Sequence, residues 1–168
     1  MFPFGDTIPS QRWAIVTYAI VVLNVIAFLW LESLPHERQL EATAQWGFVP
    51  ARIEQLFNPQ KLVRVQIGQR PRLFGPIVVG VQPVVTVLRP DPPQILASAL
   101  TCMFLHGGWW HLIGNMWFLL IFGDNIEDRL GHGLFAVFYL LGGLAATAVH
   151  WAMEPSSTMP IKIGRAHV

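Results

Sequence analysis

The sequence predicts an all-α membrane protein, a helical bundle of about three transmembrane helices with a long loop after the first. Hydrophobic residues make up 53% of its 168 residues and charged residues only 12%, about half the roughly 25% of soluble domains. Long apolar segments lie near residues 13–31, 100–122 and 134–153. The formal net charge of +1 provides no basic field for nucleic acid. The expected surroundings are therefore a lipid bilayer, and nucleic acid is not an expected partner.

The first expected span is "WAIVTYAIVVLNVIAFLWL", residues 13–31, which contains no charged residue. A spanning helix needs about 20 apolar residues, and Trp13 and Trp30 lie where an interfacial aromatic belt would be. A cleaved signal peptide is the alternative, but "WLESLPHER" lacks the small-residue cleavage site that would follow one. Asn24 is expected to hold neighbouring helices together by hydrogen bonding.

A long and more polar connection follows at residues 32–97. Its first part, "HERQLEATAQWGFVPARIEQLF", could hold short amphipathic helices. Its second part, "LVRVQIGQRPRLFGPIVVGVQPVVTVLRPDPP", mixes β-branched runs with Gly and Pro. That part could form a small hairpin or lie loosely on the membrane surface. Within it, "GPIVVGVQPVVTVL" is apolar, but we read it as extended rather than spanning.

The second and third expected spans, 100–122 and 134–153, are joined by the polar turn "GDNIEDRLGHG". Gly107-Gly108 should break the second segment, so its regular helix should begin near Trp109. Small residues in the third span allow close helix contacts: Gly142 with Ala146, and Gly143 with Thr147. The remaining polar groups have simple structural interpretations. Asp124, Glu127, Asp128 and Arg129 are boundary charges, solvated or capping; His150 is interfacial or capping; and Cys102 is a small apolar filler.

The second span also carries polar side chains that hydrocarbon penalises. His111 and Asn115 are four residues apart and share one helical face, whereas His106 precedes the double glycine and should lie on a bend. These groups could tie helices together, bind a metal, or donate hydrogen bonds to a developing oxyanion. No His-Glu-x-x-His pattern supports a metal site. Spacing alone favours helix contacts over catalysis.

The stretch "TCMFLHGGWWHLIGNMWFLLIFGDNIEDRLGHGLFAVFYLLGG" resembles the second and third membrane segments of the rhomboid family of intramembrane serine proteases. The matching features are "FLHGG", His-x4-His-x3-Asn, the "GDNIEDRLGH" turn and the "FxxFYLLGG" start of the next span. "WGFVPA" also resembles a stretch that follows the family's first span. The resemblance is dense over residues 98–153 and looser before them.

This resemblance implies a bundle of six or seven helices around a water-accessible cavity. It implies that His111 and Asn115 help bind the oxyanion and that His106 supports them, and it implies no metal or organic cofactor. The family's nucleophile is the serine of a Gly-x-Ser-Gly motif at the start of the fourth span, and its general base is a histidine on the sixth. This sequence contains no such motif, and Ser156 and Ser157 lack the flanking glycines.

Residues 1–161 are thus expected to be a partial rhomboid domain. Residues 162–168 are expected to be a sequencing artefact, because "KIGRAHV" matches the translation of a common sequencing adapter. The expected whole protein is a multi-pass serine endopeptidase of the bacterial inner (plasma) membrane that cleaves transmembrane segments of membrane-protein substrates, and this stretch by itself is expected to be inactive. Two alternatives stay open, a rhomboid-like pseudoprotease that binds membrane-protein clients without cleaving them and, more weakly supported, a small channel subunit.

Overall fold

The computed structural model describes residues 13–161, which are mostly helical with one small sheet. The expectation of an all-α fold is therefore wrong in one part, the connection after the first helix. The elements in chain order are α1 (Ile15–Ser33), α2 (His36–Trp46), the 3₁₀ helix η1 (Pro50–Leu56), β1 (Val63–Phe74), β2 (Ile77–Leu88), α3 (Pro92–Thr101), the 3₁₀ helix η2 (Cys102–Phe104), α4 (Trp109–Leu130) and α5 (His132–Met153).

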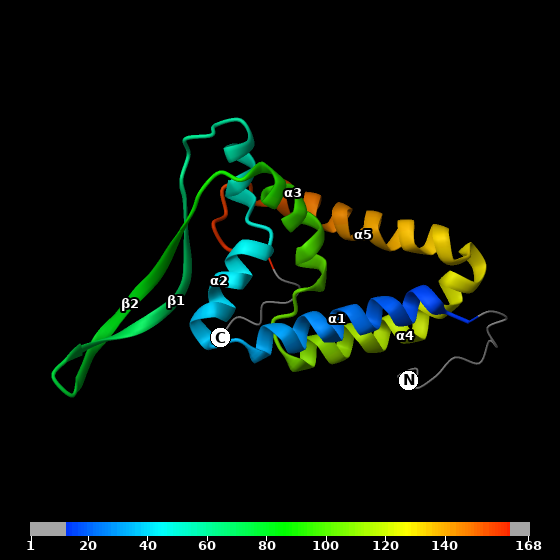
Figure 1. The fold of residues 1–168 in the computed structure, drawn as a ribbon, viewed down its shortest axis with the longest axis horizontal. Coiled ribbons are helices and arrows are strands. Elements are labelled where there is room, and N and C mark those ends of the chain that lie inside the picture. The colour runs from blue at the N-terminus through cyan, green and yellow to red at the C-terminus, as the bar shows by residue number, and fades with distance from the viewer. Residues whose placement is uncertain (1–12, 162–168) are drawn as a thin grey trace.

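Of the three long helices, α1 and α4 run together, and α5 diverges from them with distance from the α4–α5 joint (Figure 1). Helices α1 and α4 lie side by side and antiparallel, and their shared seam buries Phe28, Leu112 and Met116. The chain then reverses at Gly131, whose φ of +76° lies in the region that favours glycine. Helix α5 starts directly after this reversal and returns along the bundle, so these helices form a hairpin with a one-residue joint.

Two of the described helices, α1 and α5, are long and apolar enough to cross a membrane. They correspond within two residues to the expected spans 13–31 and 134–153. Helix α4 begins at Trp109, as the double glycine predicted, but it continues through the expected polar turn to Leu130. Four ionisable residues in its last two turns lower its apolar character. A bundle of three spans is therefore not confirmed, and residues 100–108 belong to α3, η2 and a loop instead.

Strands β1 and β2 form a two-stranded antiparallel hairpin, with pairing from Val63 with Leu88 at the base to Phe74 with Ile77 at the tip. Its β-branched residues fit a pleated surface, which explains why this stretch becomes strand rather than helix. Its base is buried, where Val63, Val65 and Leu88 pack against residues of α2 and η1. Figure 1 shows the rest of the hairpin as an arm extending away from the helices.

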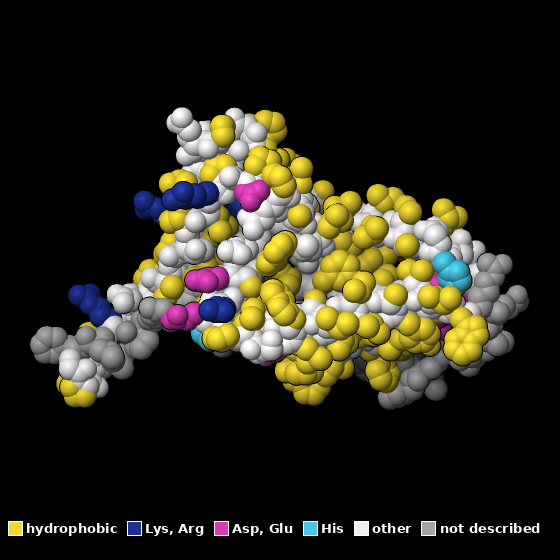
Figure 2. Space-filling view, in the orientation of Figure 1, with side chains coloured by type: hydrophobic (Ala, Val, Ile, Leu, Met, Phe, Trp, Pro, Cys, Tyr) yellow, Lys and Arg dark blue, Asp and Glu magenta, His cyan; other side chains and the backbone are white. Residues whose placement is uncertain are grey.

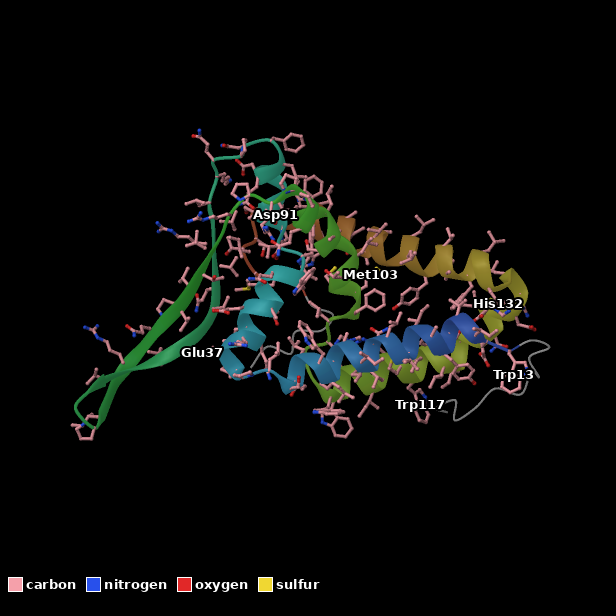
Figure 3. All side chains as sticks on the ribbon, in the orientation of Figure 1. Trp13, Glu37, Asp91, Met103, Trp117 and His132 are labelled. Carbon is pink, nitrogen blue, oxygen red and sulfur yellow. The ribbon has the colours of Figure 1, made fainter. Side chains whose placement is uncertain are left out.

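A buried polar network fixes the base of this arm. Arg52 is 1% exposed; its Nε donates to Gln55 Oε1 at 3.2 Å and its Nη2 to Gln94 Oε1 at 3.1 Å. Burial lowers the pKa of Arg52, and the nearby Asp91 carboxylate, labelled in Figure 3, partly opposes that shift. The side-chain amide of Gln55 donates to the backbone carbonyls of Lys61 and Leu88, at 2.7 and 2.9 Å.

The long helices and the connection after α1 differ in the side chains that they expose (Figure 2). Hydrophobic side chains cover the long helices on the face shown, whereas Lys, Arg, Asp and Glu gather mainly over the hairpin, α2 and η1. Exposed apolar side chains on helices are expensive in water and favourable in hydrocarbon. This division supports a membrane environment for the helices and an aqueous or interfacial one for the connection.

Candidate functional site

The candidate site lies where the chain enters α4. Gly108 precedes the helix in an extended conformation, with φ 167° and ψ 169°. His106 lies two residues earlier, outside the helix as the sequence predicted, and is 2% exposed. Its Nδ1 lies 3.3 Å from the Phe104 carbonyl oxygen of η2. The double glycine thus separates a loop histidine from the polar residues of the helix itself.

His111 and Asn115 lie in the first two turns of α4, where their spacing of four places them on one face. The Asn115 amide nitrogen lies 3.0 Å from His111 Nε2, and both side chains are half-buried. Each stands one position before a residue of the α1 seam, Leu112 or Met116. The polar pair therefore lies next to residues of the packed seam.

The two imidazoles approach one another at the start of α4. The ring centroids of His106 and His111 are 5.4 Å apart, with an angle of 51° between the ring planes. His106 Nε2 and His111 Nδ1 are both buried without a hydrogen-bond partner among residues 13–161. Buried polar atoms in proteins nearly always have partners, and exceptions deserve a specific explanation. Two such atoms on neighbouring rings mark this position as polar in an otherwise apolar region.

The chemistry open to the pair follows from its hydrogen bond. The Asn115 amide has two N–H donors, of which one is directed at His111 Nε2. When Nε2 accepts, the imidazole proton resides on Nδ1, and both this N–H and the second amide N–H can donate. Two neighbouring donors can stabilise a negative oxygen that develops between them. The pair supplies no nucleophile.

Other residues considered from the sequence lie away from this chemistry. Ser156 is exposed, and the backbone of Ser157 binds η1 through Ala51 N at 3.0 Å. Asn24 is fully buried, and its amide donates to the Ile20 carbonyl of its own helix at 2.8 Å. Residues 13–161 bring no three His, Cys, Asp or Glu side chains together as a metal-binding group.

The structure assigns a role to a residue that sequence reasoning treated as a boundary charge. Glu127, only 1% exposed, accepts hydrogen bonds from Val16 N at 2.9 Å and from Thr17 N and Oγ1, both at 2.7 Å. Its other contact is His132 Nδ1 at the start of α5, labelled in Figure 3. One carboxylate thus binds the first turn of α1 to the α4–α5 joint. One feature of the sequence could have indicated this role: Glu127 lies four residues after Gly123, on the face of α4 that contacts α1.

Together, the apolar helices and the polar pair at the start of α4 define a helical membrane protein with an imidazole–carboxamide site. The sequence profile of the Rhomboid domain matches residues 93–167, a range that includes this site. The matches to this domain and to two curated relatives support membership of the rhomboid family.

Both of these relatives come from Arabidopsis thaliana. "Rhomboid-like protein 11, chloroplastic" is 34% identical over 62 residues, which cover 37% of this chain and 22% of the relative. "RHOMBOID-like protein 7" is 25% identical over 150 residues, covering 85% of this chain and 43% of the relative. The chain therefore spans less than half the length of either relative. No solved structure matches it at a comparable level of significance.

Proposed function

We propose that the whole protein is an intramembrane serine endopeptidase of rhomboid type, in which His111 and Asn115 stabilise the oxyanion. The observation that carries this proposal is their pairing at 3.0 Å on one face of α4, beside two buried imidazole nitrogens without partners in the described residues. Ionisable or polar groups at membrane depth are costly and serve function more often than structure. Membership of the rhomboid family adds the reaction class.

The proposed reaction uses the pair only in its transition state. A substrate helix unwinds near its end and presents a peptide carbonyl to a serine nucleophile. As the tetrahedral intermediate forms, the carbonyl oxygen becomes negative and accepts hydrogen bonds from Asn115, His111 and backbone amides. These 168 residues contain no Gly-x-Ser-Gly motif. The serine nucleophile and its histidine base are therefore proposed to lie elsewhere in the whole protein. The 168-residue chain alone is expected to be inactive because nucleophile and base act as one unit.

The second candidate is a rhomboid-like pseudoprotease that binds membrane-protein clients without cleaving them. One observation favours it: the names of the two relatives say only that they are rhomboid-like. Resequencing the gene beyond Ile161 distinguishes the candidates. A Gly-x-Ser-Gly codon run supports the protease, and an uninterrupted gene without one supports the pseudoprotease.

The same resequencing tests the proposed extent of the domain. Residues 1–161 are proposed as a partial rhomboid domain, and residues 162–168, proposed as adapter-derived, lie outside the described residues. The described chain is ordered against the fold up to Ile161, whose backbone N–H donates to the Phe48 carbonyl at 2.7 Å. Membrane association is supported by the domain match and the two apolar helices. The bacterial inner membrane expected from the sequence gains no support from plant relatives, one of them chloroplastic.

The direct functional test is Asn115→Ala in the full-length protein, reconstituted with a substrate that carries one transmembrane segment. Removing one oxyanion donor costs about 3 kcal/mol in soluble proteases, so kcat should fall on the order of 100-fold or more while substrate binding changes little. Ile113→Ala is the matched control, because Ile113 lies two residues away with an exposed side chain. An unchanged kcat in Asn115→Ala would refute the assigned role, and client binding without cleavage by the wild type would favour the pseudoprotease.

A further inference from the structure

The segment "WGFVPA", residues 46–51, joins α2 to η1 and lies outside the candidate site. It is tied to the last residue of α3, because Thr101 Oγ1 donates to the Trp46 carbonyl at 2.6 Å. Phe48 is 3% exposed and packs in one apolar cluster with the buried side chains of η2. The segment therefore contacts the part of the chain that directly precedes the loop of His106.

The chain after α5 returns to this segment as a strap, residues 155–161, drawn in red in Figure 1. Backbone hydrogen bonds hold the strap there. Ala51 N donates to the Ser157 carbonyl at 3.0 Å. Ile161 N donates to the Phe48 carbonyl at 2.7 Å, and the Ile161 side chain packs in the same apolar cluster as Phe48. The strap is thus fixed by its backbone and by one side chain.

Gly47 allows the strap to approach the segment this closely. A Cβ at this position would lie 3.0 Å from the Ile161 carbonyl oxygen and 3.1 Å from Pro160 Cβ. It would also lie 2.5 Å from the Thr43 carbonyl oxygen in the last turn of α2. Backbone atoms cannot rotate away as the end of a flexible side chain can, so any larger residue here displaces the strap, the helix end or both.

The same apolar cluster supports the loop of the candidate site. Phe104 of η2 packs against the cluster, and its carbonyl oxygen lies 3.3 Å from His106 Nδ1. Because protein interiors are close-packed, displacement of the strap would shift η2 and with it the His106 ring. In the proposed protease, the chain also continues from α5 to the serine of the fourth span. The strap is then the first part of that continuation.

We propose that Gly47 and Phe48 are positioning residues for the rhomboid-type reaction. They hold the strap against η2 and thereby align two parts of the site, the His106 loop beside the oxyanion pair and the chain that leads to the nucleophile. Both act through Ile161 and η2, and neither takes part in the chemistry itself. This inference rests on the proposed function, because that function supplies the serine that has to be aligned.

The contact is tested in the 168-residue chain in mixed micelles, with the thiol of Cys102 as the reporter. Cys102 is the one cysteine of the sequence, belongs to the apolar cluster and is 3% exposed. Ile161→Pro removes the N–H that donates to Phe48, so a small maleimide should react with Cys102 several-fold faster. Ile161→Val keeps that N–H and should react at the wild-type rate. Equal rates in the wild type and both variants would overturn the proposal.

The effect on the reaction is tested in the full-length protein, with the same substrate as for Asn115→Ala. Gly47→Ala places a Cβ against the strap, whereas a Cβ in the matched control Gly133→Ala meets nothing within 4 Å. A misplacement of about 1 Å can slow a reaction about 100-fold, so Gly47→Ala and Ile161→Pro should each lower kcat at least ~10-fold, with KM changed less than about twofold. Gly133→Ala and Ile161→Val should keep the wild-type kcat.

The possible outcomes separate this inference from the proposed function. If the wild type cleaves and Asn115→Ala is slow, but Gly47→Ala and Ile161→Pro keep the wild-type kcat, the positioning role is refuted and the protease assignment stands. A rise of KM that matches the loss of kcat also refutes the positioning role. If the wild type cleaves no substrate, both fail. Circular dichroism checks each variant, and the comparison of Ile161→Pro with Ile161→Val decides the matter should Gly47→Ala not fold.

Discussion

Substitution of Glu127 tests whether one carboxylate holds the first turn of α1 to the end of α4. Glu127→Gln keeps the side-chain volume, and so opens no cavity, but removes the charge and one acceptor oxygen. In the wild type, the carboxylate accepts from two backbone N–H groups and one hydroxyl of α1. Those N–H groups have no partner within the helix, because the first four donors of any α-helix lack one. The NH₂ group of glutamine in this position would point at one of the α1 donors. Two donors cannot form a hydrogen bond with each other.

The expected loss follows from these contacts. Hydrogen bonds to a charged group contribute about 1.5–3 kcal/mol each, and they do not add fully. Because Gln retains one oxygen, we expect Glu127→Gln to lower the free energy of unfolding by about 2–4 kcal/mol. Glu127→Ala should lower it by about 3–5 kcal/mol, as the removal of one partner from a buried charged network does. Thr17→Val removes only the hydroxyl donor and should lower it by about 1 kcal/mol.

The assay is reversible unfolding in mixed micelles, followed by circular dichroism or tryptophan fluorescence. Glu154→Gln is the matched control, since Glu154 is an exposed carboxylate just after α5. Its stability should stay within about 0.5 kcal/mol of the wild type. The reasoning fails if Glu127→Gln is as stable as the control, or if Thr17→Val destabilises the chain more than Glu127→Ala does.

The other structural predictions concern helix contacts and the hairpin base. A Cβ on Gly143 would overlap the side chain of Met103, which is labelled in Figure 3, so Gly143→Ala should cost about 1–3 kcal/mol. Gly142→Ala meets nothing within 4 Å and should gain about 0.5–1 kcal/mol. Thermal unfolding checks this pair, and equal shifts would contradict it. Gln55→Leu leaves two carbonyls at the hairpin base without their donor and should cost about 2 kcal/mol of stability. It should also speed amide hydrogen exchange over residues 63–88. The control Gln60→Leu, at an exposed position, should leave that exchange unchanged.

The sequence located the long helices well where local chemistry defined their ends. Gly108 and Gly131 stop regular helix on either side of α4, and the apolar runs of α1 and α5 match their helices within two residues. It misplaced the end of α4, because Asp124, Glu127 and Asp128 read as a solvated turn. No glycine or proline interrupts residues 124–130. The helix therefore continues, since its partner α1 supplies donors for the one carboxylate that becomes buried.

The connection at residues 32–97 is a segment whose structure the sequence left undecided. Its β-branched content allowed a hairpin or a loose surface segment, and the sequence could not decide between them, because strand formation depends on cross-strand pairing. The decision came from long-range contacts: Val63, Val65 and Leu88 find a core against α2 and η1, and Gln55 satisfies the carbonyls at the base.

The sequence by itself determined the membrane character of the chain, the break before α4 and the shared face of His111 and Asn115, because composition and helical period are local properties. Only the tertiary structure decided that this polar pair stands beside the α1 seam, that His106 approaches His111, that Glu127 joins three helices, and that the strap after α5 returns to residues 46–51. The approach of His106 to His111 depends on the path of the loop before α4, and the other three depend on groups far apart in sequence that meet only when the helices pack.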